Sequence, residues 1–131
     1  MIPKELRYSA THEWARVEGE VCTVGITQFA AEQLTDIVAV DYKVKVGQRI
    51  EAAAGKEFGE IEAVKTVAGL YPPVSGEVVE LNQPLTTDPA PVSADPYGKG
   101  WMIRIKMDAG QSLDKLLTAE QYEHQIASQG H

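Results

Sequence analysis

The chain has 131 residues, a formal net charge of −7 and 44% hydrophobic residues. This length suits one domain over 1–131, and the hydrophobic share excludes a disordered chain. The acidic balance argues against nucleic-acid binding. We expect no membrane span and no export or import signal, because no apolar run is long enough and the first residues lack the required pattern. The single cysteine, Cys22, excludes an internal disulfide and fits a reducing cytoplasm.

The N-terminal third predicts a β-hairpin followed by a short helix. Residues 14–17 and 21–26 favour strands on either side of the turn at 18–20. Thr27 is a plausible N-cap, and residues 28–34 predict a short helix anchored by Phe29 and Leu34.

Extended chain with turns is predicted next. Residues 36–41 read as a strand, Gly47 and Gly55 mark turns, and residues 48–51 are extended between them. Residues 59–70 then alternate between two faces with many β-branched side chains, which indicates a strand pair around Lys65. No Asn-Gly or Asp-Gly fixes the tip of that pair. Four residues on the two sides of the lysine have the same parity in the sequence: Ile61, Ala63, Val67 and Gly69.

The last third predicts strands, a loop and helices. Pro72 and Pro73 end a strand, and residues 77–81 begin another. Residues 82–100 read as a long loop pinned by prolines, and residues 101–107 as the final strand.

Helical signals follow that strand. Ser112 could cap one helix, and Thr118 with Gln121 forms a capping box for a second. We therefore expect a strand core over about 6–107, a C-terminal helical segment over about 112–127, and a small antiparallel β-barrel or sandwich.

The residues supply little for an active site of the chain's own. His12, His124 and His131 lack metal-ligand spacing, and Cys22 has no basic neighbour that would activate it. We expect neither a catalytic nor a metal site.

The segment Glu62-Ala63-Val64-Lys65 resembles the attachment motif of the glycine cleavage system H protein family, with Ala63 where serine is usual. Five further stretches follow the family pattern in order, so that the resemblance covers nearly the whole chain. They are Tyr8 with 11–14, then 24–27, 36–38, 74–82 and 95–103.

The resemblance implies a lipoyl-type barrel-sandwich hybrid in which Lys65 carries lipoate through an amide and Glu62, Ala63 and Val64 form the attachment motif. It also implies that Glu13 and His12 belong to a cleft for the arm. The carrier would be a non-catalytic substrate of partner enzymes. The expected partners are a lipoate ligase or lipoyltransferase, glycine decarboxylase, aminomethyltransferase and dihydrolipoyl dehydrogenase.

Departures from the family pattern keep a second hypothesis open. Thr35 replaces a usual glycine, and Gly69 stands where the family usually has an aspartate. These changes spare the attachment motif and affect the side that would hold an amine cargo. The alternative is an H-like lipoate-binding protein that carries sulfur intermediates for a heterodisulfide-reductase-like sulfur-oxidising complex.

Overall fold

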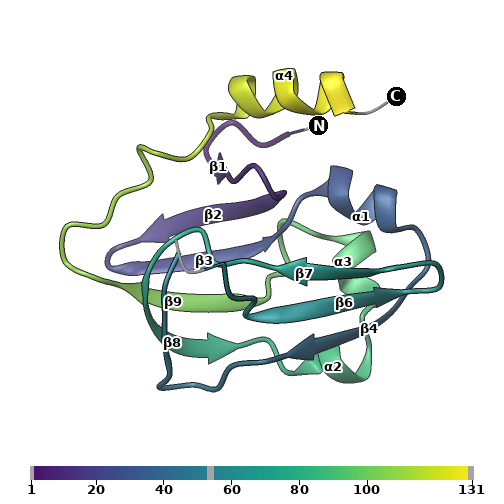
Figure 1. Cartoon of the computed structure of the whole chain (residues 1–131), viewed down its shortest axis with the longest axis horizontal. Coiled ribbons are helices and arrows are strands. Elements are labelled where there is room, and N and C mark those ends of the chain that lie inside the picture. Colours follow the sequence, from purple (N-terminus) through teal and green to yellow (C-terminus); the bar gives the residue numbers. More distant parts are fainter. Residues whose placement is uncertain (1, 53–54, 130–131) are drawn as a thin grey trace.

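Residues 2–52 and 55–129 are described by the computed structural model. They form two antiparallel β-sheets whose inner faces share one core, with helices at the margins (Figure 1). The prediction of a small antiparallel barrel-sandwich is confirmed.

The larger sheet has six strands and contains the predicted N-terminal hairpin. That hairpin pairs Glu13 with Ile26 and Glu18 with Val21, and Gly19 takes a left-handed φ of 64° in its turn. In spatial order the strands are β1 (Arg7–Tyr8), β2 (Glu13–Glu18), β3 (Val21–Ile26), β9 (Ile103–Met107), β8 (Gly76–Leu81) and β5 (Arg49–Ile50).

The smaller sheet contains the lysine hairpin. Its order is β4 (Ile37–Tyr42), β6 (Gly59–Ala63) and β7 (Val67–Leu70), so β7 is an edge strand. The turns predicted at Gly47 and Gly55 coincide with left-handed φ values of 93° and 68°.

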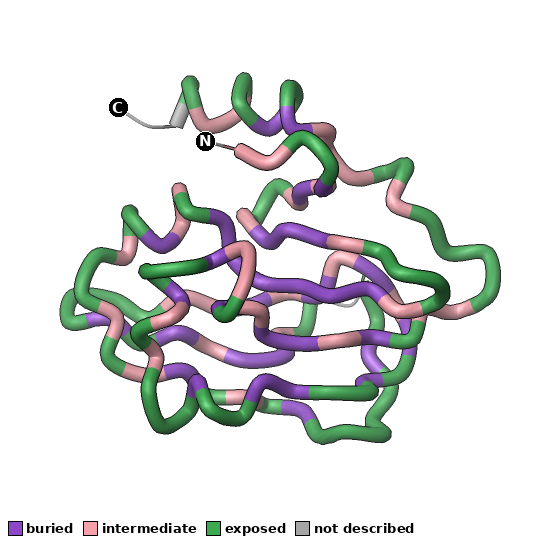
Figure 2. The backbone as a smooth tube through the Cα atoms, turned by 180° about the vertical axis from the view of Figure 1, so that it is seen from behind, coloured by how far each residue is buried: buried purple, intermediate pink, exposed green. Residues whose placement is uncertain are grey.

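Two apolar clusters hold the elements together, and Figure 2 shows the buried residues running along both sheets. The larger cluster joins Val24 and Ile103 of one sheet to Val40 and Ile61 of the other. The smaller cluster centres on Trp14 and lies under the C-terminal helix. Its buried members are Leu6, Tyr8, Trp14, Ala119 and Tyr122.

The two helices with clear caps form where the sequence predicts them. Helix α1 (Gln28–Leu34) begins at Thr27, whose hydroxyl accepts the Ala30 N–H at 3.2 Å. Helix α4 (Ala119–Gln129) follows a complete capping box: the Thr118 N–H donates to Gln121 Oε1 at 2.9 Å, and the Gln121 N–H donates to Thr118 Oγ1 at 3.2 Å.

Two predictions about the C-terminal half are wrong. The supposed loop over 82–100 contains α2 (Pro84–Thr87) and α3 (Ala90–Ala94), because proline is well tolerated in the first turn of a helix. No helix begins at Ser112; its hydroxyl accepts the Asp114 N–H, and Leu117 forms a β-bridge with Tyr8 instead. The helical part of the predicted 112–127 segment therefore starts at Ala119.

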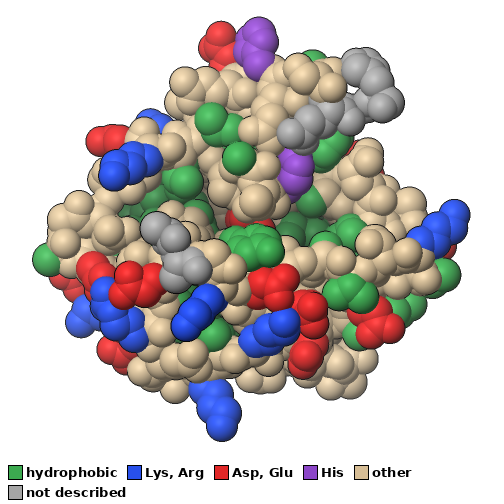
Figure 3. All heavy atoms as spheres, in the orientation of Figure 1, with side chains coloured by type: hydrophobic (Ala, Val, Ile, Leu, Met, Phe, Trp, Pro, Cys, Tyr) green, Lys and Arg blue, Asp and Glu red, His purple; other side chains and the backbone are tan. Residues whose placement is uncertain are grey.

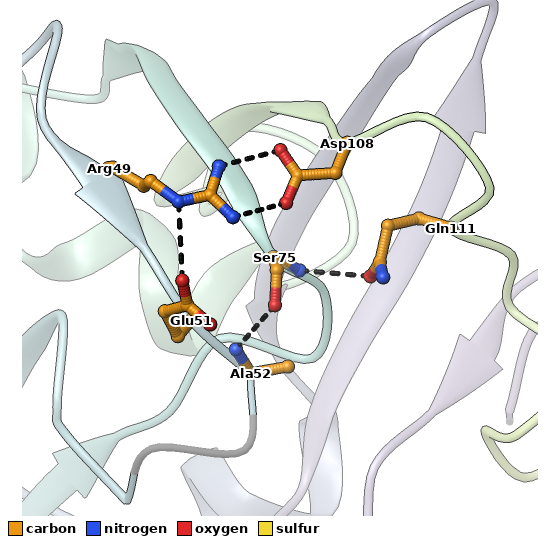
Figure 4. Close-up of polar contacts among 6 residues, drawn as sticks. All are labelled: Arg49, Glu51, Ala52, Ser75, Asp108 and Gln111. Carbon is orange, nitrogen blue, oxygen red and sulfur yellow. Dashed lines mark hydrogen bonds and ion pairs between the residues drawn. The ribbon is translucent and has the colours of Figure 1, made fainter.

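A polar cluster fixes the outer edge of the larger sheet (Figure 4). The Arg49 guanidinium donates to both oxygens of Asp108, at 2.7 and 2.5 Å. Ser75 continues the cluster by accepting the Ala52 N–H at 2.8 Å and donating its own N–H to Gln111. These contacts secure the short strand β5 to the end of β9.

Candidate functional site

Lys65 lies at the tip of the hairpin between β6 and β7. The Ala63 N–H donates to Thr66 O at 2.8 Å, so Val64 and Lys65 form a two-residue loop. The Val64 N–H donates to Asp36 O at 3.0 Å, which ties the tip to the segment before β4. The Lys65 side chain is exposed and makes no ion pair within residues 2–52 and 55–129.

The residues of one sequence parity, Ile61, Ala63, Val67 and Gly69, do not all lie on one face of the hairpin. In the hairpin, Ile61 pairs with Ala68 and Glu62 with Val67, so residues on one face have opposite parity in the two strands. Ile61 is buried, whereas Val67 is 56% exposed. An alternation count that ignores the two-residue turn assigns the residues of the second strand to the wrong face.

The residues of the predicted attachment motif divide between the two faces of this hairpin. Ala63 is buried and pairs with Ile37, while Glu62 is exposed. Val64 is 66% exposed beside the lysine. The tip therefore presents an exposed amine together with an exposed acidic and an exposed apolar side chain.

A cleft of about 320 Å³ lies between the start of β2, helix α1 and the edge of β7. Hydrophobic side chains line a hollow between these layers in Figure 3, and acidic side chains gather on the outer face of the β6–β7 layer. The lining residues are Thr11, His12, Glu13, Ile26, Phe29, Ala30, Gln33, Leu34, Ile61, Ala68, Gly69 and Leu70. His12 and Glu13 thus share one cleft, and Lys65 stands apart at the hairpin tip.

Glu13 places a carboxyl group in the wall of this cleft with only 1% of its surface exposed. Ser9 Oγ donates to its Oε1 at 2.6 Å, the Thr11 hydroxyl donates to the same oxygen, and the Tyr71 N–H donates to Oε2 at 3.3 Å. Burial raises the pKa of Glu13 to about 7, and these hydrogen bonds oppose the rise. The cleft therefore holds a carboxyl group that titrates near neutral pH.

His12 is fixed at both its backbone and its side chain. Its φ of 75° lies in the left-handed region. Its carbonyl accepts the Thr27 N–H at 3.0 Å, and its Nδ1 lies 2.7 Å from the Tyr122 hydroxyl. The ring also packs against Phe29, with centroids 5.2 Å apart.

The space beside Gly69 is filled by another acidic residue. A Cβ built on Gly69 would overlap the carboxylate of Glu57. Glu57 itself accepts a hydrogen bond from Lys43 Nζ at 2.7 Å. An acidic group therefore lies beside position 69, although it comes from the segment that precedes β6.

Thr35 also takes the conformation that the usual glycine would favour. Its φ and ψ are 57° and −116°, at the C-cap of α1. The strain lies between Leu34, which lines the cleft, and Asp36, whose carbonyl holds the hairpin tip.

Sequence reasoning missed the apolar walls of the cleft and Tyr122. Phe29 and Leu34 were assigned only as helix anchors, and the hairpin alternation could have identified Ile61 and Leu70 as inward-facing. Nothing local in the sequence places Tyr122 next to His12, since they are 110 residues apart.

Two negative findings concern the described residues only. None of their His, Cys, Asp and Glu side chains gather in a group of three or more that could hold a metal ion. None of the helices in this part of the chain is long and apolar enough to cross a membrane. His131 lies outside the described residues.

The fold consists of two antiparallel sheets, with an exposed lysine at the tip of a tight hairpin and an apolar cleft lined by the strands of that hairpin. These features define a lipoyl-type carrier domain. The chain belongs to the glycine cleavage H-protein family, whose model matches residues 6–129. Proteins of this family carry covalently bound lipoate on a lysine. The family predicted from the sequence is confirmed.

Named relatives agree over almost the full length. The glycine cleavage system H protein of Carboxydothermus hydrogenoformans is 44% identical over 130 residues, covering 99% of this chain and 98% of that protein. That of Bacillus subtilis is 49% identical over 122 residues, covering 93% and 94%. The crystal structure of the Mycobacterium marinum H protein superposes with a TM-score of 0.82 at 37% identity, covering 99% of this chain and all of that one.

Proposed function

We propose that Lys65 is the lysine that carries lipoate, and that the chain is a non-catalytic carrier in glycine cleavage. The observation that carries this proposal is the position of Lys65: an exposed amine at the tip of a hairpin whose base is held by two sheets. A rigid base with a long side chain at its tip suits a group that must visit several active sites. When bound, lipoate supplies the sulfur chemistry that takes up and releases the aminomethyl group.

The cleft residues fit such an arm. Gly69 lies four residues from Lys65, about 13 Å along β7 at the usual strand rise. The cleft offers apolar side chains to a hydrocarbon arm and one carboxyl group, that of Glu13, to an amine. A cation beside Glu13 would favour its ionised form, because opposite charges stabilise each other at short range in a buried site. We therefore assign Glu13 as the counter-charge of an amine-bearing arm and His12 as its neighbour in the cleft wall.

Glu62, Ala63 and Val64 would present Lys65 to a lipoate ligase or lipoyltransferase. Glu62 and Val64 are exposed just before the lysine, and the buried Ala63 anchors the loop. We further propose that the loaded chain serves glycine decarboxylase, aminomethyltransferase and dihydrolipoyl dehydrogenase in turn. The names of the relatives favour this cargo over the sulfur intermediates of the alternative hypothesis.

The test is reconstitution of glycine cleavage with the lipoylated chain. Exchange of labelled bicarbonate into glycine, catalysed by glycine decarboxylase, should depend on the chain and should be lost in Lys65→Arg. Lys45→Arg, which alters an exposed lysine in another loop, is the matched control and should retain full exchange. Absence of exchange with fully lipoylated protein would contradict the aminomethyl cargo.

A further inference from the structure

The hydroxyl of Tyr122 joins the C-terminal helix to two elements of the cleft. Its oxygen lies 2.7 Å from His12 Nδ1, at the start of β2, and 2.7 Å from Thr27 Oγ1, the N-cap of α1. Tyr122 and Thr27 are both fully buried. The Tyr122 hydroxyl of α4 therefore contacts both His12 in the cleft wall and Thr27, the N-cap of the helix α1 that forms another wall of the cleft.

Counting protons selects one arrangement of these hydrogen bonds. Thr27 Oγ1 accepts the Ala30 N–H, and its second partner in the described part of the chain is Tyr122. If the Thr27 hydroxyl donates to Tyr122 and Tyr122 donates to His12 Nδ1, each hydroxyl proton has an acceptor. In the reverse direction Tyr122 donates to Thr27, and the Thr27 hydroxyl proton has no acceptor among these groups. An unsatisfied donor in a buried site costs free energy.

The favoured direction fixes the state of the histidine. A neutral imidazole whose Nδ1 accepts a hydrogen bond carries its proton on Nε2. Burial raises the pKa of Tyr122 to about 12, so its hydroxyl keeps its proton throughout the physiological range.

We propose that Tyr122 is a positioning residue of the cleft, which holds neutral His12 as the Nε2–H tautomer beside Glu13. The C-terminal helix thereby determines which nitrogen of His12 donates and which accepts a hydrogen bond, although the cleft wall is formed by other elements.

Independent contacts hold Tyr122 in place for this role. Its ring stacks on Tyr8, with centroids 4.8 Å apart and an angle of 10° between the planes. Tyr8 in turn exchanges two backbone hydrogen bonds with Leu117, at 2.9 and 2.7 Å, just before α4. Gln125 of the same helix donates to Ala10 O at 3.1 Å. The helix is thus secured on both sides of Tyr122 to the segment that leads into His12.

The left-handed backbone of His12 supports a positioning role. Non-glycine residues in this region cost free energy, of order 1 kcal/mol or more, and persist where the surroundings enforce them. The Thr27 N–H and the Tyr122 hydroxyl hold the carbonyl and the ring of this one residue.

Nitrogen-15 NMR of the histidine side chains tests the proposal on the unmodified full chain. The wild-type protein should show His12 with an unprotonated Nδ1 and a protonated Nε2. Tyr122→Phe keeps the stacked ring and removes the hydroxyl, and should give a mixture of tautomers. Tyr97→Phe is the matched control, because that hydroxyl accepts the Gln28 N–H without contacting His12, and should leave the tautomer unchanged.

Two results would overturn the proposal: an Nδ1–H tautomer in the wild-type protein, or unchanged His12 signals in a folded Tyr122→Phe protein. The wild-type result decides by itself if the variant does not fold. A consequence for the arm rests on the function proposed above: bicarbonate exchange by lipoylated Tyr122→Phe should fall about two- to tenfold. A changed tautomer with full exchange would support the positioning of His12 and refute its use by the arm, whereas no exchange even in the wild-type chain would refute the proposed function.

Discussion

Glu57 occupies the space into which a side chain at position 69 would extend. Its carboxylate overlaps the point where a Cβ on Gly69 would lie, and its other oxygen accepts a hydrogen bond from Lys43. The sequence indicates the loss of an acidic group at position 69, whereas the structure shows an acidic group from a neighbouring segment beside it.

Gly69→Asp should therefore destabilise the protein modestly. The new side chain must displace Glu57, which breaks the bond to Lys43 and adds a carboxylate near Glu60, the residue paired with position 69. The cost is limited because the displaced atoms end a flexible side chain. Urea unfolding of Gly69→Asp, Glu57→Ala and the double variant should reveal favourable coupling, with Glu57→Ala relieving the defect. Strictly additive effects would show that the two sites do not compete.

Glu13 should make the protein less stable as the pH rises through neutrality. Its pKa is about 7 in the folded protein, against an ordinary value of 4.5, so the folded state binds more protons between these values. The stability contributed by the raised pKa of Glu13 is fully present below about pH 4.5 and is lost as the pH rises to about 7. Above about pH 7 it does not change further. The loss is at most about 3 kcal/mol.

The comparison of wild type with Glu13→Gln isolates this effect, since other carboxylates contribute equally to both. Urea unfolding at a series of pH values should give a steeper decline between pH 4.5 and 7 in the wild type. Parallel curves for the two proteins would show that Glu13 titrates normally.

Thr35→Gly should stabilise the protein by about 1 kcal/mol. Its φ of 57° with ψ of −116° costs a β-branched residue about 1–3 kcal/mol. Glycine removes that strain but adds about 0.5–1 kcal/mol of chain entropy to the unfolded state. Thermal unfolding measures the difference. Thr35→Ala, which retains the Cβ, is the control and should bring little of the gain; equal gains would locate the effect in the hydroxyl instead.

Sequence signals between residues a few positions apart correctly predicted where helices α1 and α4 begin. The cap at Thr27 and the capping box of Thr118 with Gln121 each involve residues three apart, and both helices begin where these signals predict. Prolines over 82–100 were misread because the same residue that ends strands also suits the first turn of α2 and α3.

The cleft could not be derived from local patterns. Its walls come from β2, α1 and the β6–β7 hairpin, and only tertiary packing brings Glu13 within hydrogen-bonding distance of the Tyr71 N–H. The association of His12 and Glu13 with one cleft came from family resemblance. The contact of Tyr122 with His12, and of Glu57 with Gly69, required the structure.

The most direct test of the account is the mass of the intact protein after incubation with lipoate, ATP and a lipoate ligase. The wild-type chain should gain the mass of a single lipoyl group, with the modification on the peptide that contains Lys65. Lys45→Arg should gain the same increment, and Lys65→Arg should gain none. An unchanged wild-type mass, or modification of Lys65→Arg, would contradict the assignment of Lys65 as the residue that carries the arm.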